Sequence, residues 1–245
     1  MAAGAILSVR GLRKQFGAES ARVAAVDGVD LDVTIGETVA IMGPSGCGKS
    51  TLLQLLGTLE RPDAGEIELA GQRVGRMSEA ALARLRRRQI GFVFQSFQLL
   101  EELTAVENVE LPALIDGRSP GKARALAAGL LERMGLDDRA GFLPSALSGG
   151  QRQRVAVARA MVNEPLVVLA DEPTGNLDSA ATTDVLRLFD TLHQAGQTLV
   201  IVTHDSRVAA TADRLIEMRD GMFVDETRLT DGSRGDLGAL IDLGD

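Results

Sequence analysis

Hydrophobic and polar residues alternate along the first part of the chain. The apolar positions of this alternation are Ile6, Val9, Leu12, Val29, Leu31, Val33 and Ile35. Because successive side chains of a strand point to opposite faces, the pattern predicts antiparallel strands that bury one face. The continuous apolar run Thr38–Met42 follows, and such a run is typical of a central strand in a parallel sheet.

After a glycine-rich loop, leucines recur at helical spacing over residues 52–59. Residues 66–69 then alternate as another strand. Over residues 78–161 the pattern is helical, because Ser78 can cap a helix and 122–134 carries apolar residues three and four positions apart. We therefore expect a mostly helical segment in this part of the chain.

Short apolar runs return at 166–170 and 198–202, separated by a helical pattern at 182–194. The sequence thus predicts an α/β core interrupted by a helical insertion, and the polar stretch 225–245 receives no predicted element. The expected parts of this single domain are a core with antiparallel strands at about 5–90 and 162–225, a helical subdomain at about 96–161 and a polar tail at about 226–245.

Composition narrows the class of protein. The chain has 245 residues, of which 45% are hydrophobic and 24% charged, as in ordinary globular proteins. Its net charge of -8 argues against nucleic acid as a partner, which needs a basic face. The single Cys47 cannot form an intramolecular disulfide, which suits a reducing cytosol. No apolar run approaches the ~20 residues that cross a bilayer, so we expect any membrane role to come through a partner.

The glycine-rich loop matches the pattern G-x-x-x-x-G-K-[ST]. Its glycines let backbone N–H groups wrap a polyphosphate, and the helix expected to begin at Lys49 adds its positive N-terminal dipole. Lys49 would reach the β- and γ-phosphates, while the Ser50 hydroxyl would complete a Mg²⁺ shell. The motif therefore predicts an ATP and Mg²⁺ site in a P-loop NTPase (RecA-like) core. The loop residues are Gly43, Pro44, Ser45, Gly46, Cys47, Gly48, Lys49, Ser50 and Thr51.

Two acids follow the apolar run 166–170, namely Asp171 and Glu172. Ligands bind outside the carboxyl ends of parallel strands, so both acids are expected near the phosphates. Asp171 can hold Mg²⁺ directly or through water, and Glu172 can polarise the water that attacks the γ-phosphate. Both depend on the metal, because charge on the γ-phosphate repels an unscreened carboxylate.

A second anion-binding surface is predicted at residues 147–151, where Ser148 and two glycines precede a helical stretch. A chain with one phosphate loop hardly needs this surface for its own nucleotide. The economical explanation is a second nucleotide that is held by another subunit.

Residues 147–151 read L-S-G-G-Q and resemble the signature of the ABC ATPases. The resemblance extends over about residues 5–225, with the motifs in the family's order. It implies that two subunits pack head to tail, with each ATP between the phosphate loop of one and the signature of the other. The residues implied to contact the partner's γ-phosphate are Ser148, Gly149, Gly150 and Gln151.

Four other positions match the same family. Gln95 matches the Q-loop glutamine, which reaches Mg²⁺ and signals to the membrane domain. His204 matches the switch histidine that steadies the γ-phosphate and the attacking water, and Asp178 matches the D-loop between subunits. The family commonly places Tyr under adenine. This chain has no Tyr or Trp, and Phe16 occupies the matching place, where it offers stacking without a hydroxyl.

Three details of the motifs, among them Gly175-Asn176-Leu177-Asp178, resemble a narrower group of ABC ATPases. This group contains lipoprotein-releasing, macrolide-exporting and antimicrobial-peptide-resistance ATPases. The resemblance implies an ATP-hydrolysing subunit that powers a permease, as an exporter or an outer-face mechanical transporter. It also implies a cytoplasmic place on the inner face of the cell membrane, with residues 96–114 receiving the permease's coupling helix.

Two alternatives remain open at this point. A division-type regulator would control an extracytoplasmic partner without transport, and its ATPase residues would be identical. A soluble ABC ATPase is the other alternative, although the chain has neither a second cassette nor heptads long enough for a coiled-coil insertion. Co-purification with a membrane protein separates the soluble class from the other two.

Overall fold

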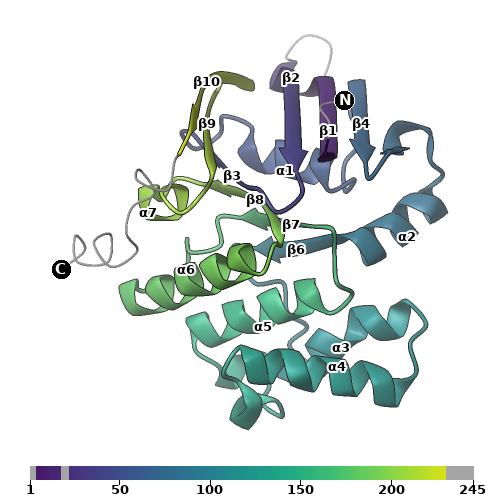
Figure 1. The fold of residues 1–245 in the computed structure, drawn as a ribbon, viewed down its shortest axis with the longest axis vertical. Coiled ribbons are helices and arrows are strands. Elements are labelled where there is room, and N and C mark those ends of the chain that lie inside the picture. Colours follow the sequence, from purple (N-terminus) through teal and green to yellow (C-terminus); the bar gives the residue numbers. More distant parts are fainter. Residues whose placement is uncertain (1–3, 18–21, 230–245) are drawn as a thin grey trace.

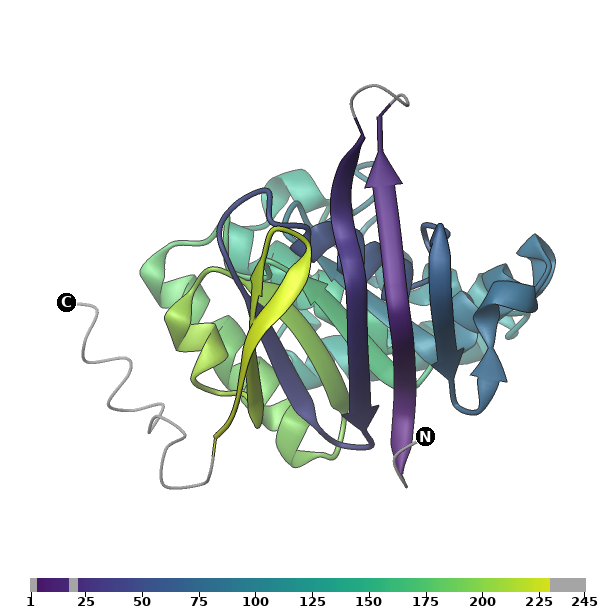
Figure 2. The ribbon, with the colours of Figure 1, turned by 90° about the horizontal axis from the view of Figure 1, so that it is seen from above.

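The computed structural model describes residues 4–17 and 22–229. The predicted antiparallel strands form a four-stranded sheet in the order β2-β1-β4-β5, and Figure 2 shows its long strands side by side. Pairing of β1 with β2 is antiparallel, as predicted, but Ile35 lies beyond β2 and is 71% exposed. The strands of this sheet are β1 (Ala5–Phe16), β2 (Val23–Thr34), β4 (Ala64–Leu69) and β5 (Gln72–Arg73).

A second sheet of six strands has the order β10-β9-β3-β8-β7-β6. Strand β3 lies between β9 and β8 and is parallel to both, which confirms the predicted central strand. The predicted runs at 166–170 and 198–202 form β7 and β8, which are also parallel. The strands of this sheet are β3 (Thr38–Met42), β6 (Ile90–Phe94), β7 (Val167–Asp171), β8 (Thr198–Thr203), β9 (Arg214–Arg219) and β10 (Met222–Arg228).

The helices fall into two groups. Figure 1 shows α3, α4 and α5 together at one end of the molecule, away from the antiparallel sheet, whereas α1 and α6 lie next to the strands of the six-stranded sheet. Ser78 caps α2, as predicted, by accepting a hydrogen bond from the Ala81 amide. The helices are α1 (Lys49–Leu56), α2 (Glu79–Gln89), α3 (Ala105–Ile115), α4 (Pro120–Arg133), α5 (Gly149–Met161), α6 (Ser179–Gln194) and α7 (Ser206–Ala209), with 3-10 turns at Val74–Arg76, Asp137–Arg139 and Pro144–Ala146.

Two expectations about secondary structure are wrong. Strand β6 lies inside the segment expected to be helical, because its five residues, four of them apolar, pair with β7, which is distant in sequence. Strand β10 occupies the start of the stretch that received no element. It pairs with β9, and the two strands are joined by Asp220 and Gly221. Both residues have positive φ, a combination that favours a tight hairpin turn. Residues 230–245 lie outside the described part.

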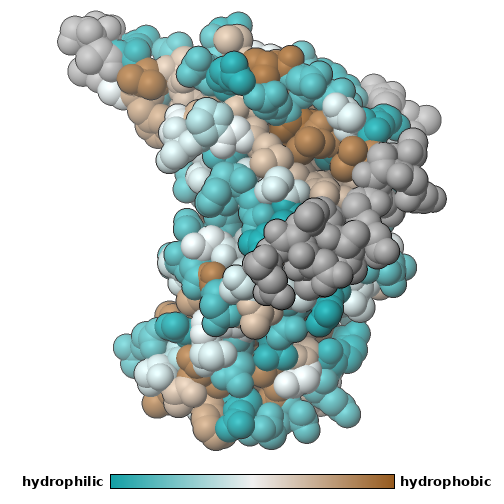
Figure 3. All heavy atoms as spheres, turned by 90° about the vertical axis from the view of Figure 1, so that its left-hand side faces the viewer, coloured by the Kyte–Doolittle hydropathy of each residue, from teal (hydrophilic) through white to brown (hydrophobic). Residues whose placement is uncertain are grey.

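Buried apolar residues form two large clusters on opposite faces of the six-stranded sheet. Val167 and Leu169 of β7 belong to one cluster, whereas Val168 and Ala170 belong to the other. This alternation explains why the parallel strands read as continuous apolar runs, since both faces are covered. Figure 3 shows the surface on the β10 side, where apolar residues gather in the half that contains the sheets. No helix within 4–17 and 22–229 is long and apolar enough to cross a membrane.

The turn before α3 is fixed by one buried side chain. Asn108 is 1% exposed, and its Nδ2 donates to the carbonyl oxygens of Leu100, Leu103 and Thr104 at 3.0, 2.9 and 3.1 Å. Its Oδ1 accepts from the Leu100 amide at 2.8 Å. Thr104 also forms a capping box with Glu107. The segment that links β6 to α3 therefore has a defined shape.

We predict that Asn108→Ala lowers the free energy of unfolding by about 3 kcal/mol, because it empties a buried position and removes the partner of several main-chain groups in the turn. Chemical denaturation measures this change. The exposed Thr191→Ala in α6 serves as the control and is expected to shift stability by no more than about 0.5 kcal/mol. Equal stability of the two variants would contradict the role of Asn108.

Candidate functional site

The glycine-rich loop between β3 and α1 passes other segments at distances that admit no side chain. A Cβ at Gly43 would lie 2.1 Å from the carbonyl oxygen of Met218, and one at Gly48 would lie 1.9 Å from that of Ala25. Gly48 also has a φ of 106°, in the left-handed region. Both glycines are therefore required by the fold itself.

Helix α1 begins at Lys49 with its N-terminus uncapped. Its N-cap residue, Gly48, has no side chain to form a capping hydrogen bond, and the first turn contains no acidic residue. The first amides of a helix need partners, and the helix dipole favours an anion there. This end of α1 can therefore accept a phosphate group.

Lys49 lies inside the loop rather than in solvent. Its side chain is 7% exposed, and Nζ donates to the carbonyl oxygens of Gly43 and Pro44 at 2.8 and 3.1 Å. Nζ is also 3.9 Å from Oε1 of Glu172. A positive charge is thus held between the loop and the acid that follows β7.

Ser50 and Asp171 form a direct pair, in which Ser50 Oγ donates to Asp171 Oδ1 at 2.9 Å. Burial raises the pKa of the Asp171 carboxyl, against the lowering effect of the Ser50 hydrogen bond; repulsion from Glu172 raises it further, and Lys49 opposes this. Within the described residues no group of three His, Cys, Asp or Glu side chains could form a metal cage. Mg²⁺ commonly takes one or two carboxylates and completes its shell with water and substrate phosphates, so this small donor set fits a metal that arrives with a nucleotide.

Glu172 and His204 meet across the ends of β7 and β8. Glu172 Oε2 accepts from the main-chain amide of His204 at 3.1 Å and lies 2.9 Å from His204 Nδ1. Glu172 has a φ of 45°, unusual for a residue with a side chain, and its own amide donates to the Val202 carbonyl at 2.9 Å. The backbone thereby turns the carboxylate towards the neighbouring strand end. The His204 side chain is 68% exposed.

These residues surround one pocket of about 590 Å³ at the carboxyl ends of the parallel strands. The structure therefore brings together the phosphate loop, Gln95, Glu172 and His204, which are far apart in sequence. The lining residues are Ala25, Ser45, Gly46, Gly48, Lys49, Ser50, Thr51, Gln95, Glu172 and His204.

Phe16 is one predicted residue that does not line the pocket. It ends β1, is 46% exposed and lies with its ring centroid 5.4 Å from Lys14 Nζ. Nearly half of its surface is exposed, and stacking of its ring on an adenine stays a prediction.

The signature also lies outside this pocket, at the start of α5. Ser148 accepts from the Gln151 amide at 3.3 Å, while Gln151 Oε1 accepts from the Ser148 amide at 2.9 Å. A Cβ at Gly149 would lie 3.3 Å from Leu177, and Asp178 caps α6 through the Ala181 amide. The signature thus contacts the D-loop of its own chain and not its own phosphate loop.

Sequence reasoning missed two residues of the site, namely Ala25, which lines the pocket, and Asn176, which lies beside it. Asn176 hydrogen-bonds to Gln95, although the two residues are 81 positions apart. An asparagine in a turn is ordinarily explained by the turn itself, so nothing in the sequence pointed to this contact.

The fold and the pocket define a P-loop nucleotide-binding protein. The family model for "ABC transporter" matches residues 26–175, and the chain belongs to this family. It is 50% identical over 229 residues to a macrolide export ATP-binding/permease protein, MacB, of Rhodopseudomonas palustris; the match covers 93% of this chain but 35% of that protein. The chain thus spans about a third of the length of the MacB relatives it matches.

Two further similarities cover nearly whole proteins. The lipoprotein-releasing system ATP-binding protein LolD of Porphyromonas gingivalis is 48% identical over 222 residues, covering 90% of this chain and 100% of LolD. A dimeric structure of the ATP-binding cassette MJ0796 bound to ADP and Pi has a TM-score of 0.85 and 39% identity. It covers 91% of this chain and 99% of MJ0796.

Proposed function

We propose that the chain is the ATP-hydrolysing part of a membrane transporter, working at the cytoplasmic face of the membrane. One observation carries this proposal, namely that Lys49, Ser50, Asp171, Glu172 and His204 converge where β3, β7 and β8 end. The similarity to proteins named for macrolide export and lipoprotein release supports outward-directed work.

The nucleotide's phosphates would lie against the uncapped end of α1 and the inward-facing amides of the loop. Lys49 would exchange its two loop carbonyls for phosphate oxygens. Ser50, Asp171 and Gln95 are the residues that would hold Mg²⁺. When bound, the ion offsets the negative charge of the phosphates.

Glu172 is the general base in this proposal. Its carboxylate is held by the His204 amide and is 14% exposed, so its position is defined before a substrate arrives. It would accept a proton from the attacking water. His204, whose Nδ1 lies beside the same carboxylate, would orient that water and contact the γ-phosphate.

We predict that Glu172→Gln keeps ATP binding but lowers turnover at least about 100-fold, because the amide cannot take the proton. Calorimetry measures the binding, phosphate release measures the turnover, and gel filtration is expected to show an ATP-bound dimer. Lys49→Ala serves as the contrasting variant and should lose nucleotide affinity itself. Near-normal turnover of Glu172→Gln would remove Glu172 from this role.

The working unit in this proposal is a head-to-tail dimer. Ser148 and its neighbours do not line the chain's own pocket, which supports a role at a nucleotide held by another copy. The similar cassette MJ0796 is dimeric in its solved structures. Each site would then combine the phosphate loop of one chain with the signature of its partner.

This arrangement predicts complementation between two inactive variants. Ser148→Arg is expected to fold and bind ATP without hydrolysing it, since the larger side chain blocks the partner's site. Mixed with Glu172→Gln, it forms heterodimers with one intact site, so the mixture should recover activity on the order of a quarter of wild type. Full activity of Ser148→Arg alone would contradict the shared site.

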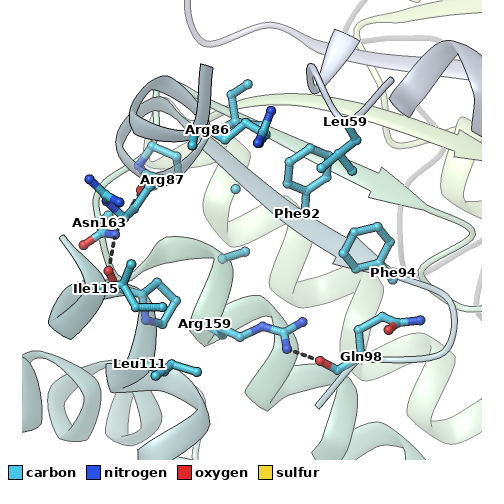
Figure 4. Close-up of a pocket in the computed structure, with 16 residues that line it drawn as sticks. Leu59, Arg86, Arg87, Phe92, Phe94, Gln98, Leu111, Ile115, Arg159 and Asn163 are labelled. Carbon is cyan, nitrogen blue, oxygen red and sulfur yellow. Dashed lines mark hydrogen bonds between the residues drawn. The ribbon is translucent and has the colours of Figure 1, made fainter. Parts of the chain in front are cut away.

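The permease is proposed to dock in a groove of about 520 Å³ between α2 and β6 on one side and α3 and α5 on the other. Figure 4 shows its aromatic wall, Phe92 and Phe94, facing Leu111 and Ile115. The groove overlaps the predicted contact segment 96–114 through Gln98, Leu111 and Pro112. Large apolar side chains in an open groove favour a docked apolar segment.

The groove is also cationic, although the chain carries a net charge of -8. Its lining includes Arg86, Arg87 and Arg159 and no acidic residue. Arg87 pairs with Asp116, whereas Arg159 bonds to the main-chain oxygens of Phe97 and Gln98. Burial lowers the pKa of the Arg159 guanidinium to about 10. We therefore propose that the docked segment carries a carboxylate.

A photo-activated cross-linker at Ile115, which is 59% exposed, is expected to capture a membrane-spanning protein in membranes of the source cell. Val224 is similarly exposed at 52% but lies on β10, outside the groove, and a cross-linker there should not capture it. Capture of only membrane-free proteins at Ile115 would favour a soluble ABC ATPase instead.

A further inference from the structure

Gln95 and Asn176 hold each other through their amide groups. Asn176 Nδ2 donates to the main-chain oxygen of Gln95 at 3.0 Å, and Gln95 Nε2 donates to Asn176 Oδ1 at 3.4 Å. One bond fixes the backbone of Gln95 and the other fixes its side chain. Both ends of the Gln95 residue are thus tied to the turn after Glu172.

Gly175 completes this contact by its lack of a side chain. A Cβ there would lie 2.7 Å from Gln95 Nε2 and 3.2 Å from its Cδ, so the Gln95 amide lies against Gly175. Gly175 does not have a positive φ, so its backbone also permits alanine. The glycine therefore leaves room for Gln95 rather than serving the turn.

The turn that carries Asn176 is itself well fixed. The Gly175 amide donates to the Glu172 carbonyl at 3.0 Å, and the Leu177 amide donates to the Thr174 carbonyl at 3.1 Å. On the other side of the turn, a Cβ at Gly149 would lie 3.7 Å from the main-chain oxygen of Asn176. Asn176 thus lies between Gln95 and the signature helix.

We propose that Asn176 is a positioning residue that holds the Gln95 amide with its nitrogen towards the turn and its oxygen free for the nucleotide pocket. An amide carries oxygen and nitrogen on opposite sides of one carbon, so holding Nε2 directs Oε1 elsewhere. Gln95 lines the nucleotide pocket, and a carbonyl oxygen is a ligand that hard cations accept. This inference rests on the proposed function, in which Gln95 serves the bound nucleotide and metal.

Amide hydrogen exchange of the nucleotide-free protein tests the contact itself. Asn176 is exposed, so Asn176→Ala should leave the fold intact. Loss of the bond to the Gln95 backbone is expected to speed exchange in residues 95–98 severalfold. The exposed Ser179→Ala, three positions along the chain, is the matched control and should leave this segment unchanged.

A double-mutant cycle tests the role, with affinity for the non-hydrolysable analogue AMP-PNP measured by calorimetry in Mg²⁺ and in EDTA. Asn176→Ala should weaken binding about fivefold in Mg²⁺ and not in EDTA. Gly175→Ala should do the same by displacing the Gln95 amide. In a Gln95→Ala background neither substitution should have a further effect.

The outcomes separate this inference from the proposed function. If the wild-type chain does not bind AMP-PNP, the proposed function fails. If it binds but the Asn176→Ala and Gln95→Ala effects multiply, Asn176 acts through another contact, and the inference is overturned. Unchanged Mg²⁺-dependent affinity in Asn176→Ala also overturns it.

Discussion

Close packing around the phosphate-binding loop is the constraint on which the rest of the structure depends. Met218 of β9 and Ala25 of β2 approach the loop at Gly43 and Gly48 so closely that no Cβ fits. The Gly221 amide, in the turn between β9 and β10, donates to the Cys47 carbonyl at 3.0 Å. Segments from both sheets and the turn between β9 and β10 thus hold the loop. A loop shaped in this way presents its amides to a ligand without first having to be ordered, which lowers the entropic cost of binding.

The charges around this loop are few and close together. Lys49 lies between the loop carbonyls and Glu172. Asp171, at the end of β7, accepts a hydrogen bond from Ser50. The two neighbouring carboxylates face only one buried lysine, so their negative charge is not fully balanced by the protein. The metal ion that accompanies a nucleotide would supply the missing positive charge. The proposed dimer follows the same logic, because the signature does not line the pocket of its own chain and would be completed by a partner's phosphate loop.

Three contacts connect the proposed permease groove with the proposed nucleotide pocket. Arg159, on the helix that begins with the signature, bonds to the carbonyls of Phe97 and Gln98, which both have positive φ. Gln95 precedes these residues and is tied to Asn176. Movement in the groove wall would therefore reach both the pocket and the signature helix through packed and hydrogen-bonded groups, which is the physical requirement for coupling between sites.

The local patterns of this sequence determined the antiparallel strands, the parallel runs, the start of α1 at Lys49 and the cap at Ser78, because each depends on neighbours within a few residues. They also placed Glu172 and His204 directly after strands. Pairings between distant segments decided the rest. Strand β6 forms only because β7 lies beside it, and β10 only because β9 precedes it across a hairpin turn. The Gln95–Asn176 contact joins residues 81 positions apart. Such contacts depend on how the whole chain packs, so no local pattern encodes them, and only the tertiary structure shows them.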